Sequence, residues 1–436
     1  MSHLNPIRVG LLGFGVVGSG TWRVLTRNAE EIARRAGRSI EIVRIATRTP
    51  SKATAVVDTT IPVDDDMFGL VADPSIDVVV ELIGGTTLAK ELVLKAIANG
   101  KHIVTANKAL LALHGNEIFK AASEKNVTVA FEAAVAGGIP IIKAMREGVT
   151  ANRIQWLAGI INGTTNFILT EMREKGLPFA DVLKKAQDLG YAEADPTFDI
   201  EGVDAAHKLT LLASIAFGIP VQFSKVYTEG ISRLAPEDVV AADRLGYRIK
   251  LLGLALRREN GIELRVHPCL VPKDKLIANV EGAMNAIVVK GDAVGETLYY
   301  GAGAGSEPTA SAVVADLVDV ARLQTADPEH RVPPLAFQEN TLADYPILPI
   351  EETTSSYYLR LQVEDRPGVM AEIATILARG NISINSMIQD PCEEGASIIF
   401  LIHKAREGNI VEAIQQIEQQ DFVKSSVTLI RLEHLS

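Results

Sequence analysis

The sequence has little cysteine, no excess of basic residues and no long apolar run. Its two cysteines, Cys269 and Cys392, lie far apart in the 436 residues and form neither a metal-binding nor a disulfide pattern. A formal net charge of -11 argues against a nucleic-acid partner, because phosphates are bound by basic patches. The longest apolar run, residues 209–221, is shorter than the roughly 20 residues that cross a bilayer. Since no secretory signal precedes the first strand-like segment, we expect a cytoplasmic protein with no membrane partner.

The first third of the chain alternates short β-branched segments with longer segments in which apolar residues recur every three or four positions. This alternation predicts an α/β domain, a parallel sheet covered by helices on both faces. The expected strands are residues 7–13, 40–47, 78–83, 102–105 and 127–132, and the expected helices are residues 19–36, 88–99 and 110–125.

The middle of the chain, residues 141–304, mixes amphipathic helices with strand-like runs and predicts an α+β domain for substrate binding and dimerisation. A glycine-rich turn at residues 301–305 opens a further helix. We expect this helix to pack back on the first domain, which would then be discontinuous and comprise residues 1–140 plus 305–325.

A proline-rich segment, residues 326–355, is the expected linker. Residues 356–436 then follow the order strand, helix, strand, strand, helix, strand. This order is typical of a ferredoxin-like domain, and the segment is long enough to fold by itself.

A glycine-rich motif joins the first expected strand to the first expected helix. The first glycine permits a tight turn, the second lets the backbone approach a pyrophosphate, and the third allows close packing of the helix, whose N-terminus favours phosphate. In this context the motif predicts a Rossmann-type dinucleotide-binding domain, the alternative being a merely structural turn. The motif is Gly13-Phe14-Gly15-Val16-Val17-Gly18.

The end of the second expected strand indicates which dinucleotide is bound. An acidic residue there usually bonds the ribose of NAD, but this sequence has Arg48 and no carboxylate. An arginine can accommodate the 2′-phosphate of NADP, so we favour NADP over NAD. If Arg48 is only a solvated surface residue, the sequence does not decide between NADP and NAD.

Five acidic residues and one lysine lie close together between residues 193 and 208. Asp204 and Lys208 are four positions apart and share a helical face. An exposed acidic loop with a surface ion pair is one interpretation, but the helix after Asp204 is otherwise apolar, which favours a polar end facing a cleft. A protonated lysine there can donate a proton to the alkoxide formed when an aldehyde is reduced.

Five segments together resemble homoserine dehydrogenase over essentially the whole chain. They are Gly84-Gly85-Thr86, Thr105-Ala106-Asn107-Lys108, residues 132–140, residues 159–166, and residues 190–196 with their continuation through Asp199, Gly202, Asp204 and Lys208. The resemblance implies the reversible NAD(P)H-dependent reduction of L-aspartate 4-semialdehyde to L-homoserine, on the route to threonine and methionine.

The resemblance also implies roles for single residues. Lys208 is the expected general acid and Asp204 its orienting partner, while Glu193 and Asp199 are expected to bind the substrate. Lys108 is expected between nicotinamide and substrate, where it would contact both and assist proton transfer; alternatively it is a surface lysine at a helix start. Further cofactor contacts are expected from Thr86 and Gly303.

The segment 132–140 resembles the family's monovalent-cation loop. The resemblance implies ligation of Na⁺ or K⁺ by the Glu132 region and by the carbonyl groups of Val135, Gly137 and Ile139. Glycine-rich loops expose carbonyl oxygens, which suit hard cations. The alternative is a plain connection from a strand to a helix that ends at Pro140.

The segment Asp365-Arg366-Pro367-Gly368-Val369 lies between an expected strand, residues 358–363, and an expected helix, residues 370–379. It resembles an ACT domain, a regulatory module that binds small amino acids, commonly between paired copies. The resemblance implies threonine as effector and a homodimer or homotetramer; a module that only dimerises is the alternative.

For the whole chain, two other functions remain open. One is another amino-acid dehydrogenase, such as one acting on aspartate, and the other is a sensor without turnover.

Overall fold

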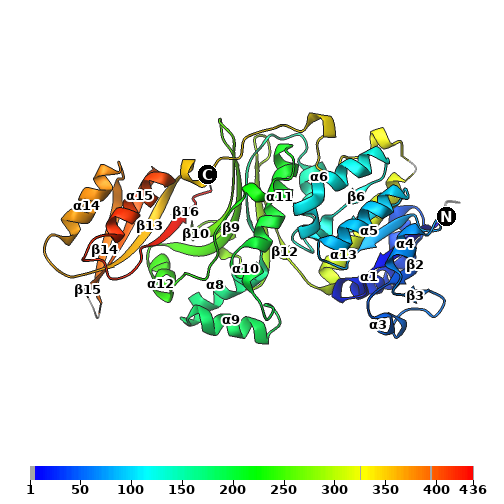
Figure 1. The fold of residues 1–436 in the computed structure, drawn as a ribbon, viewed down its shortest axis with the longest axis horizontal. Helices are drawn as coiled ribbons and strands as arrows, with labels where there is room; N and C mark the ends of the chain where they lie inside the picture. Colours follow the sequence, from blue (N-terminus) through cyan, green and yellow to red (C-terminus); the bar gives the residue numbers. More distant parts are fainter. Residues whose placement is uncertain (1–4, 325, 393–394, 436) are drawn as a thin grey trace. The chain divides into compact units, whose positions relative to one another are not determined.

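The computed structural model describes residues 5–324, 326–392 and 395–435 (Figure 1). The expected domain limits at residues 1, 325 and 436 lie outside the described residues. The chain divides into two compact units. The first comprises Met1–Leu157, Asp204–Ser224 and Met284–Tyr345, and the second Ala158–Val203, Lys225–Ala283 and Pro346–Ser436.

A six-stranded parallel sheet forms the centre of the first unit. Its order, β3-β2-β1-β4-β5-β6, is that of a Rossmann fold, as the sequence predicts. Strands β1, β4 and β5 are almost fully buried, which explains their continuous apolar character. The strands are β1 (Ile7–Leu12), β2 (Ile40–Ala46), β3 (Val63–Asp64), β4 (Val78–Glu81), β5 (His102–Thr105) and β6 (Val129–Ala130).

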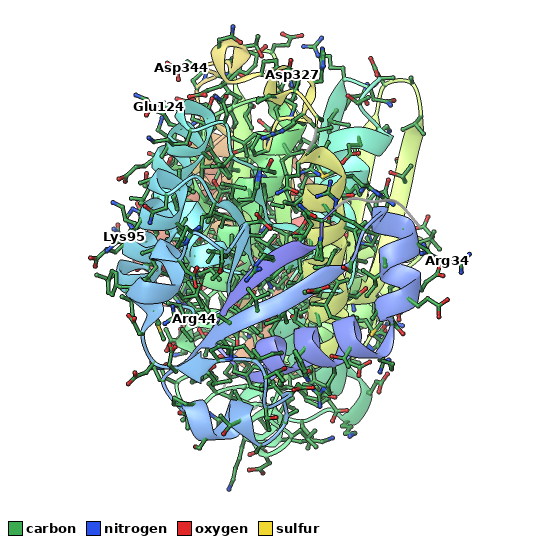
Figure 2. The ribbon with its side chains drawn as sticks, turned by 90° about the vertical axis from the view of Figure 1, so that its right-hand side faces the viewer. Arg34, Arg44, Lys95, Glu124, Asp327 and Asp344 are labelled. Carbon is green, nitrogen blue, oxygen red and sulfur yellow. The ribbon has the colours of Figure 1, made fainter. Side chains whose placement is uncertain are left out.

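Helices cover both faces of this sheet. Arg34 of α2 and Lys95 of α5 point away from the sheet on opposite sides (Figure 2). Helix α13 packs along α1 on the face shared with α2, and α4, α5 and α6 pack together on the other face. These helices are α1 (Val16–Arg27), α2 (Ala29–Ala36), α4 (Met67–Ala72), α5 (Thr87–Ala98), α6 (Lys108–Glu124) and α13 (Ser306–Leu323).

The single helix expected over residues 19–36 is wrong, because the chain breaks at Asn28 into α1 and α2. Asparagine is a weak helix former, and acidic residues follow it in the first turn of α2, where they favour a new helix start; the Asn28 side chain itself makes no capping hydrogen bond. The rest of the first unit includes α3 (Pro50–Thr54), α7 (Ile141–Lys143), α11 (Val203–Phe217) and the hairpin of β11 (Met284–Gly291) and β12 (Gly295–Ala302).

The second unit contains a long antiparallel pair, β9 (Tyr247–Arg257) and β10 (Ile262–Pro272), and the short β8 (Tyr227–Thr228), which pairs with β10. Strand β9 is absent from the expected elements, because residues 251–256 are continuously apolar and lack alternation. Strand β7 (Ile154–Ile160) begins in the first unit and ends in the second. The helices here are α8 (Gly163–Lys175), α9 (Phe179–Asp188), α10 (Thr197–Ile200) and α12 (Pro236–Arg244).

The C-terminal module, residues 354–432, has the expected ferredoxin-like order of elements. Its sheet runs β16-β13-β15-β14, and β16 also pairs in parallel with β10 through Arg431 and Leu432. The module is therefore continuous with the sheet of the second unit. Its elements are β13 (Thr354–Val363), α14 (Val369–Arg379), β14 (Ile384–Cys392), β15 (Gly395–Arg406), α15 (Glu407–Glu418) and β16 (Thr428–Leu432).

Two buried arginines reinforce the junction between β10 and β16. Arg265 on β10 contacts Glu433, which follows β16, at 2.8 Å. Arg431 on β16 contacts Glu229 at 2.8 Å and also pairs with Glu407 at the start of α15. Since an unpaired buried charge is strongly destabilising, each arginine depends on carboxylates from both sides of the junction.

Among the described residues, none of the helices combines the length and apolar character that crossing a membrane requires.

Candidate active site

The glycine-rich motif forms the turn between β1 and α1. Gly13 has a φ of +94°, and a Cβ on Gly18 would lie 2.3 Å from the Gly13 carbonyl oxygen, so the turn and the close packing both need glycine. Gly15 precedes the first residue of α1, no side chain caps the helix, and the space where a Cβ would point is open. The first amides of α1 are thus available to a phosphate.

The other cofactor residues expected from the sequence also lie in the first unit. Phe14 is buried, Val17 is half-buried and Val16 is 68% exposed, at the start of α1. Arg48 is exposed in the loop after β2 and makes no ion pair with a described residue. An exposed, unpaired guanidinium at this strand end suits an anionic group on a ligand.

A hydrogen-bond network joins the turn after β4 to the start of α6. Glu81 is fully buried, and its Oε1 accepts from the amides of Ile83 (3.0 Å) and Gly84 (3.1 Å). Its Oε2 accepts from the Thr105 hydroxyl at 2.7 Å. Asn107 donates through its side chain to the Gly85 carbonyl at 2.7 Å. Burial raises the pKa of the Glu81 carboxyl, and these hydrogen bonds oppose that shift.

Asp204 holds two lysines, one on each carboxylate oxygen. Lys208, one turn further along α11, lies 2.7 Å from Oδ2, as the four-residue spacing predicts. Lys108, the first residue of α6, lies 3.1 Å from Oδ1. The side chains of Asp204 and Lys208 are only 4% and 10% exposed, so the interpretation as a surface ion pair is wrong. The arrangement presents two ammonium groups around one buried carboxylate.

His207 lies beside this cluster on α11 but is not part of it. Its ring is buried and packs on Phe223 with 4.3 Å between the ring centroids. Burial lowers the pKa of His207 to about 4, and the positive charges of Lys108 and Lys208 act in the same direction, whereas Asp204 opposes them. The imidazole is therefore neutral near pH 7.

Residues expected to bind the substrate lie in the second unit. Asp199 on α10 is half-buried and accepts a hydrogen bond from the Asn162 side chain at 2.8 Å. Asn162 also caps α8. Glu193 is exposed in the turn between α9 and α10, close to Tyr191, whose carbonyl accepts from the Thr164 hydroxyl. The structure thus joins the fourth and fifth sequence segments around α8.

The segment 132–140 is a compact turn before α7. The Glu132 carboxylate accepts from the amides of Ile142 and Lys143, at 2.8 Å each, so it caps α7. Val135 and Ile139 are buried, and the Ile139 carbonyl accepts from the amide of Ile141. Among the described residues, no cluster of three His, Cys, Asp or Glu side chains is placed to hold a metal ion. Any ion here would depend on carbonyl oxygens.

Gly137 and Gly303 touch where this turn meets the end of β12. A Cβ on Gly137 would lie 2.5 Å from the Gly303 carbonyl oxygen, and a Cβ on Gly303 would lie 2.0 Å from the Asn285 side chain. Asn285 is 1% exposed, and neither polar atom of its amide has a hydrogen-bond partner within the described part of the chain. Leaving a buried amide without a hydrogen bond costs free energy, so the space beside the Asn285 side chain suits a bound polar group.

Comparison with known proteins identifies the family. Residues 13–132 match the profile of the homoserine dehydrogenase NAD-binding domain, residues 140–318 that of homoserine dehydrogenase, and residues 357–422 that of the ACT domain. Homoserine dehydrogenase of Pseudomonas aeruginosa is 64% identical over 99% of this chain and its own full length. The chain belongs to the homoserine dehydrogenase family.

Solved structures agree with this assignment. A homoserine dehydrogenase from Thiobacillus denitrificans superimposes with a TM-score of 0.95 at 66% identity, covering 99% of both chains. A hyperthermophilic archaeal homoserine dehydrogenase, solved with NADPH, covers 74% of this chain and 99% of its own, with a TM-score of 0.63 and 25% identity. The chain is thus an NAD(P)-dependent oxidoreductase with a Rossmann domain and a C-terminal ACT domain, as expected from the sequence.

Three features of this homoserine dehydrogenase fold were not apparent in the sequence. Glu81 lies within an apolar strand, where a single carboxyl gives no signal of its hydrogen-bond partners. Asn285 likewise lies in a strand-like run. The contact of Lys108 with Asp204 joins distant parts of the chain, and the spacing of residues within either segment gave no signal of it.

Proposed function

We propose that the enzyme reduces L-aspartate 4-semialdehyde, with NAD(P)H and a proton, to L-homoserine and NAD(P)⁺, reversibly and on the cytoplasmic route to threonine and methionine. One observation carries the proposal: a single buried carboxylate, Asp204, holds the ammonium groups of Lys108 and Lys208. A reductase of aldehydes needs such a proton donor together with a nicotinamide-binding fold.

The bound cofactor supplies the hydride, and the chain supplies the proton. Lys208 donates a proton from Nζ to the oxygen of the substrate as negative charge develops there. Asp204 keeps the Lys208 ammonium charged and oriented. Lys108 adds a second positive charge next to the same carboxylate, contacts cofactor and substrate, and stabilises the developing alkoxide.

We assign the substrate's amino group to Glu193 and Asp199. A carboxylate is the natural partner of an ammonium group, and both residues belong to the family's most specific motif in this sequence. The hydrogen bond from Asn162 fixes the orientation of the Asp199 side chain.

We propose NADP as the preferred cofactor, held by residues 13–18, Thr86, Lys108 and Gly303, with Arg48 at the 2′-phosphate. The open position at Gly15 and the exposed Arg48 support this assignment, as does the NADPH bound to the archaeal homologue. We further propose that the nucleotide domain comprises residues 1–140 plus 305–325, since α13 packs along α1.

We propose that residues 132–140 bind Na⁺ or K⁺. The carbonyl groups of Val135, Gly137 and Ile139 would supply oxygen ligands, and the unsatisfied Asn285 amide beside Gly303 supports a polar occupant at this place. Since the Glu132 carboxylate caps α7, its contribution would be to fix the turn and add negative charge.

We propose that threonine inhibits the enzyme through the ACT domain of a homodimer or homotetramer, with residues 141–304 also contributing to dimerisation. Gly368 has a φ of +98° and opens α14, whose first amides carry no side-chain cap. A carboxylate of an amino acid can bind there. Strand β14 ends the sheet of the module and leaves an edge for pairing with another copy.

The test is reduction of NADP⁺ and NAD⁺ by the purified protein with L-homoserine, with and without Na⁺, K⁺ and L-threonine. We expect turnover that favours NADP⁺, rises with a monovalent cation and falls with threonine. Turnover with aspartate and not with homoserine would establish another amino-acid dehydrogenase. Binding of NADPH without any turnover would establish a sensor instead. Turnover unaffected by threonine would leave the ACT domain a role in dimerisation.

A further inference from the structure

Glu81 is a fully buried carboxylate at the end of β4 that none of the roles above uses. Two backbone amides and one hydroxyl donate to its two oxygens. A carboxylate that accepts several fixed donors is held in one orientation, and it holds its donors equally firmly.

The partners of Glu81 belong to two different loops. Oε1 binds the amides of Ile83 and Gly84 and so shapes the turn in which Gly84 and Gly85 have φ values of +71° and +73°. Oε2 binds the hydroxyl of Thr105, the last residue of β5. One carboxylate thus connects the ends of two neighbouring parallel strands, the edge at which such sheets bind ligands.

Thr105 and Asn107 carry the connection on to α6. The Thr105 oxygen accepts from the Asn107 amide at 3.0 Å, and the Asn107 Oδ1 accepts from the Leu110 amide at 3.1 Å, which caps the helix. The Asn107 side chain closes the ring by donating to the Gly85 carbonyl. Lys108, which follows directly, therefore begins its helix at a place set by this ring.

We propose that Glu81 is a positioning residue for hydride transfer: through Thr105 and Asn107 it holds the Gly84–Gly85 turn and Lys108 in one fixed geometry. The proposal rests on the proposed function for placing nicotinamide and substrate beside these two elements. Small displacements of reacting groups are costly, since about 1 Å can reduce the rate about 100-fold.

The experiment compares Thr105→Val, which removes the hydroxyl between Glu81 and Asn107, with its matched control Thr105→Ser, which keeps it. Glu81→Gln is the third variant. We expect kcat to fall about tenfold or more in Thr105→Val and Glu81→Gln and to stay within about twofold of the native value in Thr105→Ser. We also expect a larger primary isotope effect with NADPH deuterated at the transferred position, because hydride transfer becomes slower relative to the other steps.

Binding of 2′,5′-ADP, which lacks nicotinamide, separates positioning from general damage. Its Kd should stay within about twofold of native in all variants, since none of the hydrogen bonds of the ring comes from residues 13–18, although Gly13 packs beside Ile83. Native turnover of homoserine tests the proposed function in the same experiment. In an active native enzyme, an unchanged kcat and isotope effect in Thr105→Val would overturn the proposal. So would a loss of 2′,5′-ADP binding that parallels the loss of kcat.

Discussion

The turn at residues 13–18 and the lysine cluster of Lys108, Asp204 and Lys208 are built in opposite ways. The turn is made of consecutive residues, presents backbone amides and contains no titratable side chain. The cluster is made of charged side chains from α6 and α11 around one buried carboxylate. The binding of a phosphate thus depends here on backbone shape, whereas proton transfer depends on charges that are costly to bury.

The largest effect is expected from Lys208→Ala, which removes the proposed proton donor and leaves the turn untouched. We expect kcat to fall about 1,000-fold or more, since a positioned acid and its charge both disappear. The Kd of NADPH, measured by fluorescence titration, should stay close to native. Lys208→Arg is the control for charge alone. Near-native turnover of Lys208→Ala would show that another group supplies the proton.

Acid should lower the free energy of unfolding through His207, whose ring lies beside the lysine cluster. Its pKa is about 4 in the folded chain and about 6.5 when unfolded, so the unfolded chain binds more protons between these values. The free energy of unfolding is then fully present above pH 6.5 and falls by about 3 kcal/mol as the pH drops to 4. Urea unfolding of the native protein and of His207→Gln, each followed from pH 7 to 4.5, measures how much His207 contributes to this loss of stability. Parallel curves for the two proteins would exclude it.

Alanine substitutions at Gly15 and Gly18 test the turn in two separable ways. A methyl group at Gly18 meets the Gly13 carbonyl, whereas one at Gly15 meets no described atom within 4 Å and occupies only the path of a ligand. Both variants should weaken NADPH binding about tenfold. Calorimetry should show a lower Tm for Gly18→Ala alone. A lower Tm for Gly15→Ala would mean that this glycine serves the fold and not the phosphate.

The smallest effect is expected from Arg48→Ala. Removing this exposed guanidinium should raise the KM of NADP⁺ about fivefold and leave that of NAD⁺ unchanged, because only NADP⁺ carries the 2′-phosphate. The ratio of kcat/KM for the two cofactors measures the change. An equal rise in the KM of both cofactors would show that Arg48 does not bind the 2′-phosphate.

Local patterns explain which parts of the structure could be predicted. The parallel strands, the turn at residues 13–18 and the pair of Asp204 and Lys208 follow from spacing within a short segment, and the structure contains all three. The C-terminal module was predictable because its strands and helices have distinct apolar periods.

Features that depend on tertiary contacts could not be predicted. The contact of Lys108 with Asp204 and the ring around Glu81 arise only when separate strand ends meet. Strand β9 is buried over most of its length, and residues 251–256 form an apolar run with no alternation to distinguish it from a buried helix. The break at Asn28 shows that one residue with a weak helix propensity can divide an otherwise continuous helical period.

The pairing of β16 with β10 has a consequence for the integrity of the whole enzyme. Strand β10 is buried along nearly all of its length, and the last strand of the ACT domain pairs with it at Cys269 and Leu270. A chain shortened before residue 354 would leave Cys269 and Leu270 without this partner strand and Arg265 without Glu433. Unprotected edge strands recruit other chains and aggregate. The last strand of the ACT domain is therefore also a structural part of the second unit's sheet, so a deletion meant to remove regulation alone would also take an ion-pair partner from a buried arginine.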